Sequence, residues 1–180
     1  MTLTLILGGA RSGKTTLALR LAKAHSPAPV MIATAEALDA EMAERIARHQ
    51  AERSSRWRTV EAPLDLTGAI EALGPGELAV VDCLTLWLSN QLLAGHDVEA
   101  ETERLLAAMG GRNLILVSNE VGLGIVPDNA LARRFRDAQG RLNQRVAAIC
   151  DQVVFVAAGL PLVMKGKMDE VTSRQSSGGC

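Results

Sequence analysis

Eight residues near the start of the chain have the types and spacing of a phosphate-binding loop. They fit the pattern G-x-x-x-x-G-K-[ST] and are Gly8, Gly9, Ala10, Arg11, Ser12, Gly13, Lys14 and Thr15. In such a loop, backbone N–H groups surround phosphate oxygens, and the amino end of the next helix adds partial positive charge. We expect Lys14 to act in catalysis on the β- and γ-phosphates, and the Thr15 hydroxyl to bind Mg²⁺. A glycine-rich turn without a ligand is the alternative, and the strand–loop–helix context argues against it.

A second oxygen donor for the metal is expected at Asp82. This residue ends the apolar stretch 78–82, which is typical of a core strand. In proteins with a phosphate loop, an acidic residue at the end of such a strand binds Mg²⁺ directly or through water. An N-cap of the following helix would look the same in the sequence. The phosphate loop makes the metal role the better interpretation.

Residues 36–56 are expected to form a helix with one basic face. At the 100° step of a helix, seven side chains fall within roughly a quarter-turn: Leu38, Met42, Arg45, Ile46, His49, Arg53 and Arg56. Burying three arginines together is costly, so an anion lying over this face would explain the pattern. Their charge would favour neutral His49, the nucleophilic form. A core histidine is the alternative, and the spacing alone does not decide between the two.

Three further polar features have open interpretations. Glu61 ends a short strand, where it is either a solvated carboxylate or an acceptor for a sugar or base edge. Glu120, in the stretch Asn-Glu-Val-Gly after residue 118, is a general base, a Mg²⁺ contact or a loop acid. The arginine-rich helix 129–149 is a solvated face, a site for an anionic substrate or a contact with a partner subunit. A functional role is slightly favoured, because Arg134, Gly140, Arg141 and Asn143 do not fit a simple apolar stripe.

Apolar strands alternate with helices along the chain. Strands are expected at 2–7, 30–33, 57–61, 78–82, 113–118 and 152–157, with an edge strand at 160–164, and helices after the phosphate loop and at 36–56, 64–73, 84–93, 98–109 and 129–149. This order predicts an α/β fold with a mostly parallel sheet covered by helices on both faces. Residues 1–166 form one domain, and residues 167–180 are expected to be a disordered tail. The loops after Leu7, Ala33, Asp82 and Ser118 should line one site, because such sheets bind ligands at the carboxyl ends of their strands.

Composition excludes several functions. The 180 residues carry a net charge of −1 without a basic block, and there are two Trp, two Phe and no Tyr. Neither a nucleic-acid partner nor a base-stacking surface is therefore predicted. The three cysteines have no ligand-like spacing, which favours a reduced, cytoplasmic compartment. No apolar run is long enough for insertion into a bilayer.

Taken together, these motifs resemble the bifunctional adenosylcobinamide kinase / adenosylcobinamide-phosphate guanylyltransferase family of cobalamin biosynthesis. The resemblance spans about residues 3–166. It is carried by the phosphate loop, Ile32-Ala33-Thr34, Arg45-Ile46 with His49 and Arg53, Trp57-Arg58-Thr59 with Glu61, Asn119-Glu120-Val121-Gly122 with Gly124-Ile125-Val126-Pro127, and Arg141 with Asn143-Gln144. This combination is far more specific than the phosphate loop alone.

The resemblance implies two reactions. A nucleotide, ATP or GTP, phosphorylates adenosylcobinamide. GTP then guanylylates a histidine, and GMP passes to adenosylcobinamide phosphate, giving adenosylcobinamide-GDP and pyrophosphate. The family's R-I-x-x-H pattern falls on His49, and Arg48 stands where some relatives have a second histidine. The implied nucleotide contacts are the phosphate loop, Thr34, Ala35, Glu36, Gln50, Ala51, Glu52, Arg53, Glu61 and Asp82. The family also implies a RecA-like P-loop sheet and a homotrimer.

Two other functions share the phosphate loop. A kinase for a different small molecule would not need His49, because it forms no covalent intermediate. A nucleotide-dependent switch would turn over slowly and would need no acceptor pocket. The Asn-Glu-Val-Gly loop and the basic face around His49 favour chemistry over switching.

Overall fold

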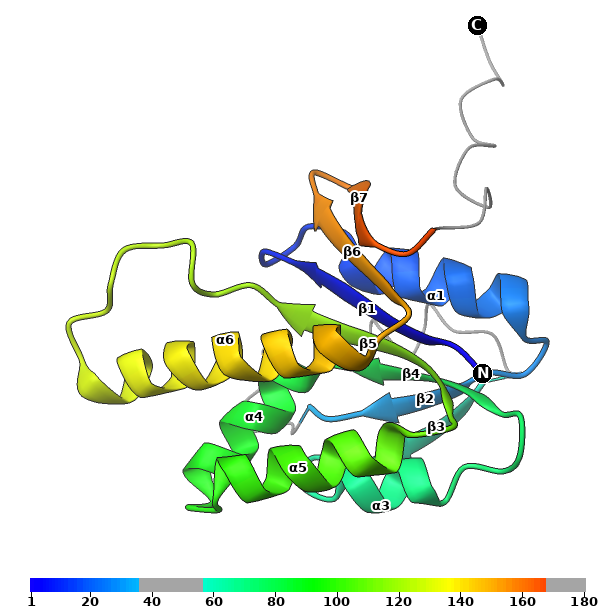
Figure 1. Ribbon diagram of the computed structural model, residues 1–180, viewed down its shortest axis with the longest axis horizontal. Coiled ribbons are helices and arrows are strands. Elements are labelled where there is room, and N and C mark those ends of the chain that lie inside the picture. The colour runs from blue at the N-terminus through cyan, green and yellow to red at the C-terminus, as the bar shows by residue number, and fades with distance from the viewer. Residues whose placement is uncertain (36–56, 168–180) are drawn as a thin grey trace, which may run out of the picture.

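The computed structural model describes residues 1–35 and 57–167, and its centre is one seven-stranded sheet (Figure 1). The strand order is β3-β2-β4-β5-β1-β6-β7. Neighbouring strands are parallel except for β7, which runs antiparallel to β6. The strands are β1 Leu3–Gly8, β2 Val30–Ala33, β3 Arg58–Glu61, β4 Leu78–Asp82, β5 Asn113–Asn119, β6 Gln152–Ala157 and β7 Leu160–Lys165. The expected α/β class and the expected edge strand are confirmed.

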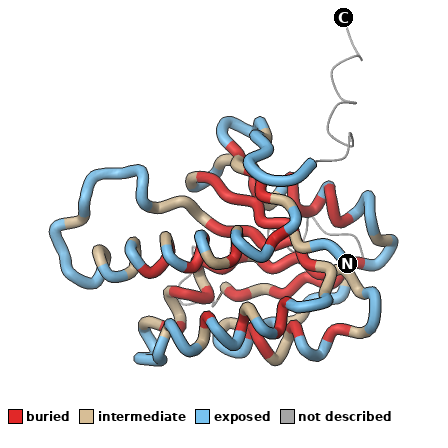
Figure 2. Tube along the Cα trace, in the orientation of Figure 1, coloured by how far each residue is buried: buried red, intermediate tan, exposed pale blue. Residues whose placement is uncertain are grey.

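Helices cover both faces of the sheet, and the apolar core is split accordingly. The helices are α1 Lys14–His25, α3 Leu66–Glu71, α4 Leu84–Leu93, α5 Val98–Met109 and α6 Ala130–Ile149. On one face, alternate residues of β1, β2, β4 and β5 pack against α3, α4, α5 and α6. On the other face, the intervening residues pack against α1. The central strands are buried on both sides (Figure 2), which explains their continuous apolar sequences.

Short polar side chains start several of these helices. The Asn129 side chain accepts from the Ala132 N–H at 2.9 Å and so caps α6. Asp97 caps α5 in the same way, by accepting from the N–H groups of Glu99 and Ala100. The expected helix over 64–73 is shorter in the structure. Its start is displaced because the Leu64 carbonyl accepts from the Trp87 indole at 3.1 Å and Asp65 caps the helix instead.

The order of the strands brings the ends of β1, β5 and β4 together. β5 lies between β1 and β4, with Gly8 level with Asn119 and Asp82 level with Val117. The residues that follow β1 and β4 therefore face each other across the end of β5. The expected helix over 36–56 and the tail beyond residue 167 lie outside the described residues. Among those that are described, no helix has the length and apolar character needed to cross a membrane.

Candidate functional site

The phosphate loop leaves β1 through a glycine that no other residue can replace without strain. Gly8 has φ +154°, and a Cβ there would overlap the Val156 carbonyl oxygen and lie 2.8 Å from the Ser12 Oγ. At the far end, Gly13 has φ +98° and precedes the first turn of α1. Arg11 also adopts a left-handed conformation, with φ +55°. These backbone angles wrap the chain tightly, as a loop that binds an anion through N–H groups requires.

The turn between β6 and β7 supports the phosphate loop, and this contact was not predicted from the sequence. The Gly159 N–H donates to the Ser12 carbonyl at 2.9 Å. A Cβ on Gly13 would lie 3.3 Å from the Gly159 Cα. The two segments are far apart in the sequence, so only the register of β1 with β6 brings them into contact. The one available signal was Gly159, two positions after the expected strand 152–157, since glycine allows the positive φ of +78°.

Lys14 lies within the loop. Its side chain is only 6% exposed, and its ammonium group donates to the Gly9 carbonyl at 2.5 Å and to the Ser12 Oγ at 3.5 Å. A buried ammonium needs partners because desolvation penalises the charge. Phosphate oxygens would supply stronger partners than these neutral acceptors. The position therefore fits the expected contact with the β- and γ-phosphates.

The two predicted metal ligands meet. The Thr15 hydroxyl donates to the Asp82 carboxylate at 3.2 Å, although 67 positions separate the residues in the chain. A hydroxyl and a carboxylate are hard oxygen donors that suit Mg²⁺, which keeps several waters and binds through phosphates as well. Within residues 1–35 and 57–167, no group of three or more His, Cys, Asp or Glu could enclose a metal ion. The Thr15 hydroxyl and the Asp82 carboxylate fit a cation held jointly by protein and nucleotide.

Thr34 joins the ends of β2 and β4. It is fully buried, and its hydroxyl donates to the Cys83 carbonyl at 2.7 Å and accepts from the Cys83 N–H at 2.8 Å. The Asn90 amide donates to the Thr34 carbonyl at 2.9 Å. These bonds hold the backbone immediately after Asp82. Ala35 follows at the same edge, and Glu61 ends β3 there with an exposed side chain.

Glu120 lies beside the phosphate loop. Its backbone N–H donates to the Gly8 carbonyl at 3.0 Å. One oxygen of its carboxylate accepts from the Gly122 N–H at 2.6 Å. The carboxylate thus closes its own turn at the end of β5, and the backbone ties that turn to the loop.

The α6 arginines are largely engaged within the chain. Arg141 and Arg145 pair with Glu99 on α5 at 3.3 and 3.4 Å, and Arg145 also pairs with Glu103. Arg133 donates hydrogen bonds to the Pro127 and Asp128 carbonyls, and Arg136 forms an ion pair with Asp137. Of the interpretations that the sequence left open, these contacts favour a solvated face that also ties α6 to α5.

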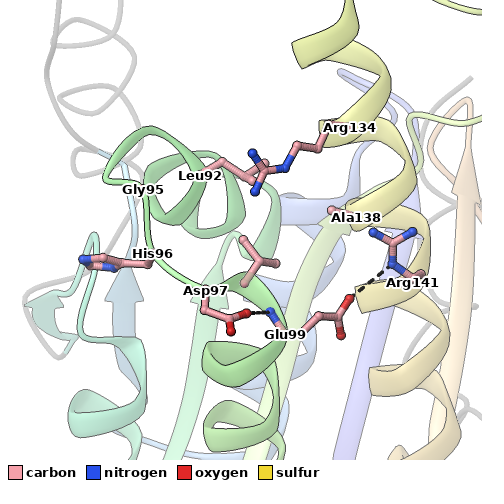
Figure 3. A pocket seen from close by; sticks show the side chains of 9 residues that line it. Leu92, Gly95, His96, Asp97, Glu99, Arg134, Ala138 and Arg141 are labelled. Atoms are coloured by element: carbon pink, nitrogen blue, oxygen red, sulfur yellow. Dashed lines mark hydrogen bonds and ion pairs between the residues drawn. The ribbon is translucent and has the colours of Figure 1, made fainter.

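A pocket of about 360 Å³ lies between the α4–α5 turn and α6. Arg134 and Arg141 lie on α6, Glu99 on α5 pairs with Arg141, and His96 lies at the turn (Figure 3). The His96 Nδ1 is 2.6 Å from the Gln91 Oε1. None of the nucleotide-site residues predicted from the sequence lines this pocket. Its charged groups are exposed and of both signs, so it does not define a ligand class.

The buried cysteines are not nucleophiles at neutral pH. Burial, with a smaller contribution from the Asp82 charge, raises the pKa of the Cys83 thiol to about 11. Burial also raises the pKa of Cys150, to about 12. Both thiols are therefore protonated. Of the predicted site residues, His49, Glu36, Gln50, Ala51, Glu52 and Arg53 lie outside the described residues, as does Arg45.

Comparisons with known proteins agree with one another. The family model "Cobinamide kinase / cobinamide phosphate guanyltransferase" matches residues 4–164. The chain is 50% identical over 169 residues to the "Bifunctional adenosylcobalamin biosynthesis protein CobP" of Pseudomonas aeruginosa, with coverage of 91% of this chain and 97% of that protein. It is 40% identical over 179 residues to the "Bifunctional adenosylcobalamin biosynthesis protein CobU" of Salmonella typhimurium, with coverage of 89% of this chain and 98% of that protein.

One solved structure indicates the fold. The flagellar accessory protein FlaH from Methanocaldococcus jannaschii superposes with a TM-score of 0.51 at 12% identity, covering 92% of this chain and 78% of that chain. At this identity the likeness concerns the fold alone. With the strand–loop–helix geometry of the phosphate loop, the sheet is that of a P-loop NTPase.

Proposed function

The chain belongs to the cobinamide kinase / cobinamide phosphate guanyltransferase family, and from this we propose that it phosphorylates adenosylcobinamide and then transfers GMP to the product. Adenosylcobinamide-GDP and pyrophosphate result. The structural observation that carries the proposal is the convergence of Lys14, Thr15 and Asp82 around the phosphate loop. These groups serve phosphoryl and nucleotidyl transfer, whereas the buried thiols offer no competing nucleophile.

In the first reaction, the alcohol oxygen of adenosylcobinamide attacks the γ-phosphorus of ATP or GTP. The bond to the nucleoside diphosphate breaks, and the hydroxyl proton is released. The loop N–H groups and Lys14 hold the phosphates as charge shifts toward the leaving oxygen. Thr15 and Asp82 would hold Mg²⁺, which would neutralise phosphate charge when bound.

In the second reaction, we propose His49 as the nucleophile. An imidazole nitrogen bonds to the α-phosphorus of GTP, and the bond to pyrophosphate breaks. The phosphate of adenosylcobinamide phosphate then attacks the same phosphorus, and His49 leaves. Support comes from the R-I-x-x-H pattern and from Arg45 and Arg53, whose spacing places them on the same predicted helix face. Further proposed nucleotide contacts are Thr34, Ala35, Glu36, residues 50–53 and Glu61.

We also propose that the enzyme is a cytoplasmic homotrimer. Exposed apolar side chains support self-association: Leu123 is 82%, Ile125 97% and Val126 61% exposed in the loop between β5 and α6, and Leu131 follows on the helix. This loop projects from the body of the molecule (Figure 1). Apolar side chains concentrated on a projection are typical of a surface covered by a partner. Light scattering after chromatography measures the oligomeric state, and a monomer at micromolar concentration would exclude the trimer.

The decisive experiment follows the guanylyl group. Wild-type protein incubated with α-labelled GTP and Mg²⁺ should acquire label that survives base and hydroxylamine and is lost in mild acid, as expected of a P–N bond. Adding adenosylcobinamide phosphate should move the label to the corrinoid. His49→Ala should abolish labelling, and His25→Ala, which changes an exposed histidine at the end of α1, should keep it.

Other outcomes separate the rival functions. Label on the His49→Ala protein would exclude this nucleophile. Inversion at phosphorus in wild-type transfer would indicate one displacement, whereas two displacements give retention. A protein that phosphorylates some other small molecule and never acquires label would be the simple kinase. Slow hydrolysis without any acceptor would indicate a switch.

A further inference from the structure

Strand β5 ends in the space between the phosphate loop and the proposed metal ligand. Asn119, its last residue, is level with Gly8 on β1. Two residues earlier, Val117 is level with Asp82 on β4. Since neighbouring strands lie about 4.8 Å apart, Asn119 is adjacent to the start of the phosphate loop and one strand away from Asp82.

The alternation of side chains directs Asn119 to the face that carries the phosphate loop. Ile115 and Val117 pack in the core cluster beneath α1, whereas Leu114 and Leu116 pack on the opposite face. Ser118 continues the second set, since its hydroxyl bonds to α6. By the two-residue period of a strand, the Asn119 side chain lies on the α1 face. The Thr15–Asp82 contact lies on that face too.

The backbone of Asn119 is held on both sides by buried side chains. Its N–H donates to the Thr85 Oγ1 at 2.7 Å, and its carbonyl accepts from the Asn143 amide at 3.0 Å. The Ser118 hydroxyl donates to the Asn143 Oδ1 at 2.7 Å, and the Gln139 amide donates to both residues at 2.9 Å. A buried polar cluster is costly unless its members are bonded, and in this one the Gln139 Oε1 alone lacks a partner among the described residues. This one fixes the end of β5 from α4 and α6.

The Asn119 amide itself is left available. The side chain is half-buried, and no hydrogen bond or ion pair within residues 1–35 and 57–167 engages its amide. An amide N–H₂ group can donate to a phosphate oxygen without adding a charge. A triphosphate seated in the loop, with a cation held by Thr15 and Asp82, would direct its terminal phosphate toward the gap between β1 and β4. That gap is the end of β5.

We propose that the Asn119 side-chain amide donates a hydrogen bond to the terminal phosphate of the bound nucleoside triphosphate, as a further catalytic residue. Thr85 and Asn143 are positioning residues, because they hold the backbone that aims this amide. The inference rests on the nucleotide site of the proposed function and assigns it a group that distinguishes triphosphate from diphosphate. With the α- and β-phosphates held by the loop N–H groups, a diphosphate would lack the terminal group that Asn119 binds.

The test compares two nucleotides on the same protein. Calorimetry with Mg²⁺ measures the affinity of each variant for GDP and for a non-hydrolysable GTP analogue. Asn119→Ala should weaken binding of the GTP analogue about 10- to 100-fold, as loss of a hydrogen bond to a charged group predicts. The affinity for GDP should change less than about twofold. Asn119→Asp should weaken the analogue further, because a carboxylate repels phosphate. Asn113→Ala is the matched control, since Asn113 begins the same strand at its opposite end.

Substitution of a positioning residue should likewise change the ratio of the affinity for the GTP analogue to the affinity for GDP. Asn143→Ala should lower the affinity for the analogue more than that for GDP, whereas a purely structural role would lower both or neither. GDP affinity therefore reports on folding in every variant. Equal losses for GDP and the analogue in Asn119→Ala, or no loss of either, would overturn the inference. Binding alone decides this, so failure to label His49 would overturn the guanylyl mechanism without affecting the result for Asn119.

Discussion

Replacing Gly8 by alanine is the most direct test of the loop geometry. Gly8 has φ +154°, and an added Cβ would overlap the Val156 carbonyl oxygen and lie 2.8 Å from the Ser12 Oγ. Real Cβ atoms essentially never approach other atoms within 3.0 Å. Gly8 is also paired with Asn119 on one side and Val156 on the other. Its backbone therefore has no free direction in which to relax.

Two costs contribute to the expected loss of stability. Holding a residue with a Cβ in this conformation costs about 1–3 kcal/mol. Displacing packed backbone to admit the methyl group costs about 1–3 kcal/mol more. The free energy of unfolding should thus fall by about 2–6 kcal/mol. For a domain of this size, each kcal/mol shifts the melting temperature by about 2–4 °C, so Gly8→Ala should melt roughly 4–24 °C below wild type.

Gly9 provides the matched control in the same loop. A Cβ on Gly9 would have no neighbour within 4 Å, so Gly9→Ala should melt within about 2 °C of wild type. Differential scanning calorimetry of the two variants without nucleotide measures both shifts. If Gly8→Ala melted with wild type, or if Gly9→Ala lost as much stability, the described path of the loop would be wrong.

Two further predictions concern the loop lysine and the buried thiols. Lys14→Met should weaken GTP binding in calorimetry by roughly 10- to 160-fold, since a charge-assisted phosphate contact contributes about 1.5–3 kcal/mol. The control Lys23→Met, on the exposed side of α1, should bind GTP normally. Equal GTP affinities of the two variants would refute the phosphate contact of Lys14. In a Cys180→Ser background at pH 8, iodoacetamide should label neither Cys83 nor Cys150 until the protein is denatured, because their pKa values of about 11 and 12 keep them protonated. Both values exceed the ordinary thiol pKa of 9.0. The stabilisation that the folded protein gains by keeping these thiols neutral should therefore be complete below pH 9 and decline as the pH rises toward 11. Rapid labelling of the folded protein at pH 8 would contradict the protonated state of the thiols.

Local patterns in the sequence predicted most of the framework. The phosphate loop is a contiguous motif whose glycines, lysine and threonine each have a fixed position, so its flanking strand and helix followed directly. The apolar strands could be recognised because a parallel sheet covered on both faces demands continuous apolar residues. Asp82 followed from its place at the end of such a strand. Helix bounds followed less closely from the sequence: α3 starts later than expected because side chains of α4 donate to the Leu64 carbonyl.

The relations between distant segments came only from the tertiary structure. Strand order and register bring Gly159 to the phosphate loop and place Asn119 between Gly8 and Asp82. The pairing of Arg141 with Glu99 likewise depends on how α5 packs beside α6. The sequence by itself determined which residues could handle phosphate and metal, because that chemistry resides in residue type and local spacing. Their neighbours were decided by packing, since contacts across a sheet join residues whose separation in the chain has no local signal.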